Sequence, residues 1–140
     1  MPTKLALTSI VISASIRDVF RFVAEMRNMP RWAPAFAPRV EQCADGSWDI
    51  VREEERIPIR QVRSRRLGVV DFVRKPDEAA ARGAFVRMIA LSADECAVVM
   101  AVPVANGQDS ERLQQSIEEE LAALREILSP KAVRSMRPNC

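Results

Sequence analysis

Two arginines fall on strand faces that are otherwise apolar, and these side chains are well suited to hold a polar ligand group. Arg52 follows Ile50 on one expected strand face, and Arg87 lies between Phe85 and Ile89 on another. A buried arginine needs a partner, and its planar guanidinium matches the geometry of a carboxylate or enolate oxygen. An ion pair with an inward glutamate, or a strand end at which the side chain reaches water, would satisfy the same arginines.

Asp71 is the candidate for a general base, provided that its side chain faces the same interior. Its neighbours Val70 and Phe72 favour an outward orientation. The sequence contains no histidine and no tyrosine, which excludes imidazole metal sites and both Ser-His-Asp and Cys-His catalysis. Catalysis is therefore an open alternative with Asp71 and Arg87 as its candidates, and neither a metal nor a cofactor is expected.

The composition is that of one ordinary globular domain. The chain has 140 residues, of which 48% are apolar and 29% are charged. A net charge of +2 gives no general support for nucleic acid binding. No apolar run is long enough to span a membrane. The lack of an export signal and three widely separated cysteines favour a reduced, cytoplasmic protein.

The segment from Asp109 to Leu128 is the element that must organise the domain. About twenty helical residues form a rod near 30 Å long. A helix with one apolar stripe of that length needs a large partner surface, and the strand-rich middle of the chain supplies it. The residues that recur every three or four positions are Leu113, Ile117, Leu121, Leu124 and Leu128.

Strand patterns cover Leu5–Ile12 and most of the chain after residue 38. A helix from Ile16 to about Met26, capped by Ser15, follows the first strand. Three prolines then limit residues 27–38 to one short helical turn around Trp32. The later strands are expected at Arg39–Cys43, Ser47–Glu54, Arg60–Arg66, Val69–Arg74, Ala84–Leu91 and Cys96–Val102, with Pro58 breaking the pattern. This order predicts a single α+β domain over residues 1–128 and a flexible tail at 129–140.

Four short motifs carry a resemblance to a known family: Val19-Phe20-Arg21-Phe22-Val23, Asn28-Met29-Pro30-Arg31-Trp32, Asp45-Gly46-Ser47-Trp48 and Val69-Val70-Asp71-Phe72. Together with the leucine-rich closing helix, they resemble the START-like helix-grip (SRPBCC) superfamily, and most closely its polyketide cyclase/dehydrase and lipid-transport branch. The resemblance covers residues 5–128. It implies a curved antiparallel sheet of about seven strands wrapped around a long C-terminal helix, with two short helices after the first strand. It also implies a cavity between the sheet and the helix.

The expected ligand-binding residues are large side chains on the sheet's apolar face, the terminal helix and the proline-rich loop. They would line an apolar pocket of roughly 300–1,000 Å³ or would fill a closed, dry core. We therefore expect binding of a hydrophobic small molecule, such as a lipid, a quinone or an aromatic polyketide. A cyclase/dehydrase-type enzyme acting in the same cavity is the alternative. The residues are Trp32, Phe36, Trp48, Ile50, Phe72, Phe85, Arg87, Met100, Leu113, Ile117 and Leu121.

A cluster of arginines between Arg56 and Arg66 is the densest concentration of charge. Alternation places Arg63 and Arg65 outward, where charge discourages aggregation of a strand face. The alternative is an anionic partner, such as an acyl carrier protein, a lipid head group or RNA. RNA lacks support, because no aromatic residues interleave with these arginines. A protein-interaction or chaperone module that uses the Arg56–Arg66 face is a further alternative, as is a homodimer.

Overall fold

The computed structural model describes residues 3–74 and 82–129. The predicted tail therefore lies outside the described residues except for Ser129. The elements in chain order are β1 (Leu5–Ile12), α1 (Ile16–Ala24), η1 (Met26–Asn28), α2 (Met29–Trp32), β2 (Arg39–Gln42), β3 (Trp48–Arg52), β4 (Glu55–Ser64), β5 (Val69–Arg74), β6 (Gly83–Ser92), β7 (Glu95–Pro103) and α3 (Ser110–Leu128).

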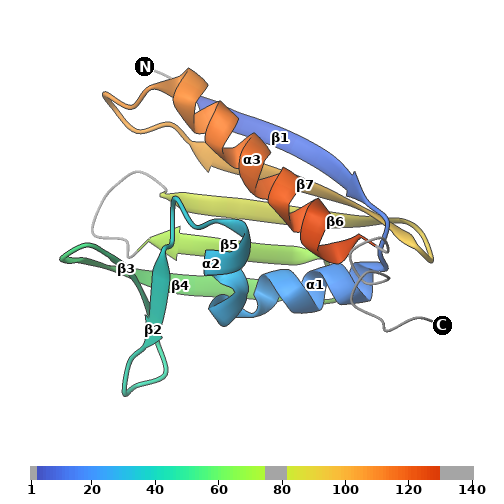
Figure 1. The fold of residues 1–140 in the computed structure, drawn as a ribbon, viewed down its shortest axis with the longest axis horizontal. Coiled ribbons are helices and arrows are strands. Elements are labelled where there is room, and N and C mark those ends of the chain that lie inside the picture. The colour runs from blue at the N-terminus through green and yellow to red at the C-terminus, as the bar shows by residue number, and fades with distance from the viewer. Residues whose placement is uncertain (1–2, 75–81, 130–140) are drawn as a thin grey trace, which may run out of the picture.

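One seven-stranded sheet, in the order β1-β7-β6-β5-β4-β3-β2, forms the body of the domain, and every neighbouring pair is antiparallel. Figure 1 shows α1, α2 and α3 on one face of this sheet, with α3 crossing it diagonally over β1, β7 and β6. The first strand pairs with the last one, which brings β1 beside α3. The predicted α+β helix-grip architecture is confirmed.

The helix ends follow local sequence signals. Ser15 caps α1, because its hydroxyl oxygen accepts a hydrogen bond from the Asp18 N–H at 3.2 Å. The Asp109 carboxylate caps α3 by accepting from the N–H groups of Glu111 and Arg112. The α3 helix ends at Leu128, as predicted, two residues before Pro130.

The core lies between the three helices and the inner face of the sheet. Val70 and Phe72 of β5, Val86 of β6 and Met100 of β7 are at most 1% exposed. From α3, the side chains of Ile117, Leu121 and Leu124 enter the same cluster. The stripe read from the sequence is therefore the face that α3 presents to the sheet.

The face of β6 that packs against the core is the opposite of the one predicted. The predicted inner residues Phe85, Arg87 and Ile89 lie on the outer face of the sheet. In the observed register, Val86 stands opposite both Val70 and Met100, which are fully buried. Because side chains alternate along a strand, this register turns the odd-numbered residues of β6 outward.

The sequence predicts that Pro58 breaks the strand pattern, but in the structure Pro58 lies inside β4. It stands opposite Asp49 of β3, and in the described part of the chain the pairing with β5 begins one residue later, at Ile59. A proline in such a pair must direct its ring nitrogen away from β3. Its missing N–H therefore removes no hydrogen bond of the described ladder.

The edge strand β1 is closed by one side chain of α3. Gln114 Nε2 donates to the Leu7 carbonyl oxygen at 2.8 Å, and Gln114 Oε1 accepts from the Leu7 N–H at 3.2 Å. Gln114 therefore occupies the backbone groups that an added strand would use.

Replacing Gln114 with alanine is expected to lower the free energy of unfolding by about 1 kcal/mol and to speed amide exchange at Leu7. Urea unfolding and hydrogen exchange measure the two effects. Gln115→Ala is the control, because Gln115 bonds only to the neighbouring Glu119 on the exposed side of the helix. Equal exchange rates at Leu7 in the two variants would contradict this account of the edge.

Candidate functional site

Most of the predicted ligand-binding residues meet in one cluster under α3. Trp32 from α2, Ile50, Phe72 and Met100 from the sheet, and Ile117 and Leu121 from α3 are each at most 2% exposed. Three more of the predicted residues are partly buried against this cluster: Phe36, Trp48 and Leu113. Phe85 and Arg87 do not join it, because they lie on the opposite face of the sheet.

The space beneath the centre of α3 is filled by side chains. The Ile117, Leu121 and Leu124 side chains are at most 2% exposed, and neither Ile117 nor Leu121 lines any of three surface cavities in the described residues. Methionine contributes much of the filling, with Met26, Met29 and Met100 all at most 3% exposed. Its unbranched thioether chain adapts to irregular spaces, so such a core can repack more easily than one built from branched residues.

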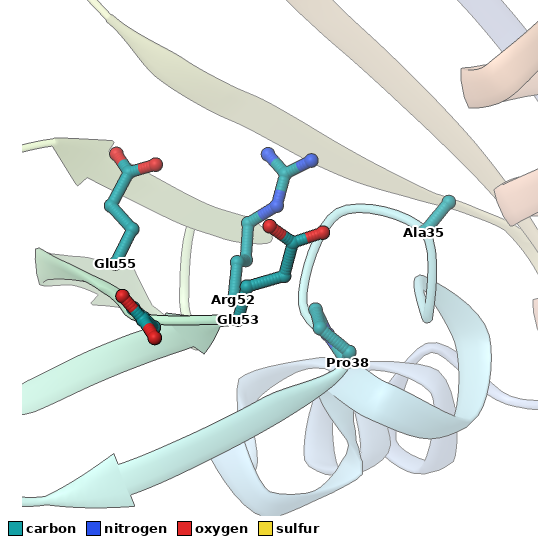
Figure 2. A pocket seen from close by; sticks show the side chains of 6 residues that line it. Ala35, Pro38, Arg52, Glu53 and Glu55 are labelled. Atoms are coloured by element: carbon teal, nitrogen blue, oxygen red, sulfur yellow. The ribbon is translucent and has the colours of Figure 1, made fainter.

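The largest of the three cavities, about 690 Å³, is open at the surface, and all the residues that line it are exposed. It is bounded on one side by Ala35 and Pro38, in the segment that follows α2, and on the other by the β3–β4 hairpin. Figure 2 shows the Arg52 and Glu53 side chains extending from that hairpin beside the loop. The sequence predicted ligand-binding residues in the proline-rich loop but not the acidic hairpin as the opposite wall. The hairpin residues are Arg52, Glu53, Glu54 and Glu55.

Arg52 is the cation of this cavity. It shares a strand face with Ile50, which is fully buried, so its stem starts on the inner side of the sheet as predicted. Among the described residues, no carboxylate or carbonyl oxygen accepts a hydrogen bond from its guanidinium. An exposed arginine without a partner at the rim of a cavity is available to a ligand oxygen.

The hairpin also gives the cavity negative charge. Glu53 and Glu54 lie between the paired residues Arg52 and Glu55, and Glu55 is 4.0 Å from the Arg74 guanidinium. Glu53 has a φ of 51°, and it is the one described residue other than glycine with a positive φ. This left-handed backbone closes the two-residue turn. The rim therefore offers one donor group and two unpaired carboxylate acceptors, a set that favours a ligand with both carbonyl and hydroxyl groups.

Arg87 and Asp71, the predicted catalytic candidates, form an ion pair on the outer face of the sheet. The Arg87 Nη1 atom donates to Asp71 Oδ1 at 2.6 Å. Asp71 faces outward, as its neighbours Val70 and Phe72 had favoured. Neither side chain reaches the inner face, so neither can act on a molecule held there.

Trp32 has a buried donor without an acceptor. Its indole nitrogen is enclosed, and no described atom accepts its N–H. The ring packs against Phe72 with 6.2 Å between centroids. Buried donors are nearly always paired with protein, water or ligand, so this N–H marks a place for an acceptor. Trp32 immediately precedes the loop that walls the large cavity.

Glu120 is the described carboxylate whose ionisation is most perturbed. Burial raises its pKa to about 7, and the neighbouring charge of Glu119 adds to the effect. Glu120 lies within one helical turn of Ile117 and Leu124, beside the buried stripe of α3. Sequence reasoning missed it, because it stands in an ordinary-looking run of three glutamates.

Burial raises the pKa of the Cys96 thiol, which lowers its reactivity at neutral pH. No group of three or more cysteine, aspartate or glutamate side chains among residues 3–74 and 82–129 is placed to hold a metal ion. In the same residues, no helix is long and apolar enough to cross a membrane.

Comparison with known proteins gives structural relatives but no match by sequence. No family model matches the chain, and no curated protein does. A protein from Nitrosospira multiformis superposes with a TM-score of 0.71 at 13% identity, over 94% of this chain and all of that one. The Zhui aromatase/cyclase from Streptomyces sp. R1128 gives 0.65 at 16% identity, over 97% of each chain.

A third relative is the di-domain aromatase/cyclase BexL from the BE-7585A biosynthetic pathway. Its TM-score is 0.67 at 20% identity, and the match covers 88% of this chain but only 45% of BexL. At these identities the likeness establishes the fold alone. The chain thus has a helix-grip fold, and aromatase/cyclases are among the proteins whose structures resemble it.

Proposed function

We propose that this protein binds a hydrophobic small molecule whose polar end carries carbonyl and hydroxyl groups, as quinones and aromatic polyketides do. The observation that carries the proposal is Arg52, an arginine without a described partner at the rim of a cavity of about 690 Å³. A guanidinium donates to carbonyl oxygens, and Glu53 and Glu54 accept from hydroxyl groups. Two carboxylates beside one arginine disfavour a ligand that is simply an anion.

The apolar part of the ligand would enter the core beneath the loop that follows α2. The Trp32 N–H, which lacks an acceptor, supports a second polar contact at that depth. The methionines of the same core cluster support repacking, since their unbranched side chains can change between several rotamers. The aromatase/cyclase structures with the same fold support a ligand of this chemical class.

Native mass spectrometry with a panel of ligands tests the proposal. The panel contains a long-chain fatty acid, a naphthoquinone and a hydroxylated anthraquinone. We expect retention of the hydroxylated compound and about tenfold weaker binding in Arg52→Ala, equivalent to the loss of one charge-assisted hydrogen bond. Arg112→Ala is the matched control, because it removes one exposed arginine at the start of α3. Equal affinity in the two variants, or no retained compound, would reject the proposal.

A cyclase-type reaction is the second candidate, and the observation that favours it is Glu120, a carboxyl beside the buried stripe of α3. A carboxyl with a pKa near the working pH can both accept and donate a proton. Glu120 is therefore the candidate proton-transfer group instead of Asp71 and Arg87, since those two residues form a pair on the outer face of the sheet. Turnover of a flexible poly-ketone that is unchanged in Glu120→Gln would remove this candidate.

A further inference from the structure

A second cavity, of about 250 Å³, lies between α1 and the far end of β4, and four arginines line it. Two of them, Arg17 and Arg21, are one turn apart on α1. The other two are Arg63, near the end of β4, and Arg65, the first residue after that strand. This cavity is distinct from the one at Arg52. Residues 55 and 63 are roughly 26 Å apart along the strand, at about 3.3 Å per residue.

The fold brings these four arginines together, which the sequence pattern did not predict. Arg63 pairs across the sheet with Val70, which is fully buried, so it emerges on the helix side and not outward as expected. The two elements are joined by Gln61, whose Nε2 donates to the carbonyl oxygen of Ala24 at the end of α1 at 2.9 Å. The cluster expected on one outer face is therefore split, and Arg56 remains on the outer face.

The four guanidinium groups lack anionic partners in the part of the chain that the structure describes. The one carboxylate among the lining residues, that of Glu25, accepts from Arg27 at 3.3 Å. Five arginines elsewhere in the described residues are paired with carboxylates: Arg27, Arg39, Arg56, Arg74 and Arg87. Like charges one helical turn apart are destabilising, and a second pair from β4 adds to the repulsion. An anion in the cavity would relieve it.

We propose that this cavity binds the phosphoryl group of a phosphorylated small molecule. Guanidinium groups bind phosphate oxygens through paired, charge-assisted hydrogen bonds, and several of them around one concave site select for multiple negative charge. The cavity has room for one or two phosphoryl groups but not for an extended chain. Phe20 adds an aromatic ring to the wall, which suits an organic group attached to the phosphate.

Isothermal titration with inorganic pyrophosphate, at about 20 mM and about 150 mM salt, tests the proposal. We expect saturable binding with a stoichiometry of one. The double variant Arg21→Ala/Arg63→Ala should weaken it by about tenfold or more. The matched control is Arg112→Ala/Arg125→Ala, which removes the same charge from α3 and should change affinity by less than about twofold. Thermal unfolding of both variants verifies that each is folded.

Two sources of the phosphoryl group, a free metabolite and a lipid head group, are separated by a vesicle arm. Sedimentation with phosphatidylcholine vesicles carrying a phosphorylated inositol lipid, lost in Arg21→Ala/Arg63→Ala only, would assign the group to a lipid. Pyrophosphate binding without vesicle binding would assign it to a soluble molecule. Absence of saturable binding, or equal weakening in the two double variants, would overturn the proposal, because either result reduces the cluster to general positive charge.

Discussion

Replacing Leu121 with alanine is expected to lower the free energy of unfolding by about 2–5 kcal/mol. Leu121 is 1% exposed and lies in the core cluster with Ile117, Leu124 and Phe72. Truncation removes the transfer energy of the side chain and leaves a cavity that the rigid sheet cannot close fully. The effect is large because α3 contacts the sheet through a single stripe of apolar residues.

Chemical denaturation with circular dichroism measures this effect. Glu118→Ala is the control on the same helix, since its exposed side chain should change stability by no more than about 0.5 kcal/mol. A loss below about 1 kcal/mol in Leu121→Ala would contradict the view that the contact between α3 and the sheet holds the domain together.

Replacing Glu120 with glutamine is expected to stabilise the protein above pH 7 by on the order of 2 kcal/mol and to have little effect near pH 4. Burial raises the pKa of Glu120 from 4.5 to about 7 in the folded protein. The folded state therefore binds this proton more tightly than the unfolded state does. Stability contributed by the proton is complete below pH 4.5, falls as the pH rises through this window, and is absent above pH 7.

The pH dependence itself is the measurement. Unfolding free energies of the natural protein should decline between about pH 4.5 and 7 by more than those of Glu120→Gln, in which no proton is exchanged at this position. Glu119→Gln is the control and a second test, because removing the neighbouring charge should lower the pKa of Glu120. Parallel stability curves for the natural protein and Glu120→Gln would show that Glu120 ionises normally.

The features that sequence reasoning predicted correctly are those fixed by local rules. The Ser15 cap, the hairpin at Asp45-Gly46 and the stripe of α3 each depend on residues within a few positions of one another. The Asp45 carboxylate also accepts from the Ser47 N–H and hydroxyl, which lowers the pKa of Asp45 and fixes the turn. The strands after residue 38 were predicted within two residues of their observed bounds, except at the start of β4, which lies five residues before the predicted Arg60.

The face of β6 could not be read from the sequence, because both of its faces are apolar. Phe85 and Ile89 alternate with Val86 and Met88, and the sequence predicts Phe85 and Ile89 on the inner face if that face is the more apolar one. The buried pair is decided by the register against β5 and β7, which is information from distant parts of the chain. As a result Ile89 is 52% exposed, while Val86 is buried.

The candidate site could be anticipated only in part, because its arrangement also depends on contacts between distant parts of the chain. Arg52 was assigned to the inner face correctly, since Ile50 beside it is the most apolar position of a short strand. The arginines of α1 were not connected to those of β4, because nothing in the sequence indicates that these two elements meet. A charge cluster whose residues come from different elements, such as Arg21 and Arg63, can be recognised only from the folded structure.

The most direct test of ligand binding is the indole N–H resonance of Trp32, followed by proton–nitrogen NMR during titration with a hydroxylated anthraquinone. Trp48→Phe assigns the resonance, since the chain has two tryptophans. We predict a saturable shift of the Trp32 signal as its N–H gains an acceptor, and a weaker response at the same ligand concentration in Arg52→Ala. A Trp32 resonance that stays fixed while the ligand binds, or a titration that never saturates, would contradict the proposed site.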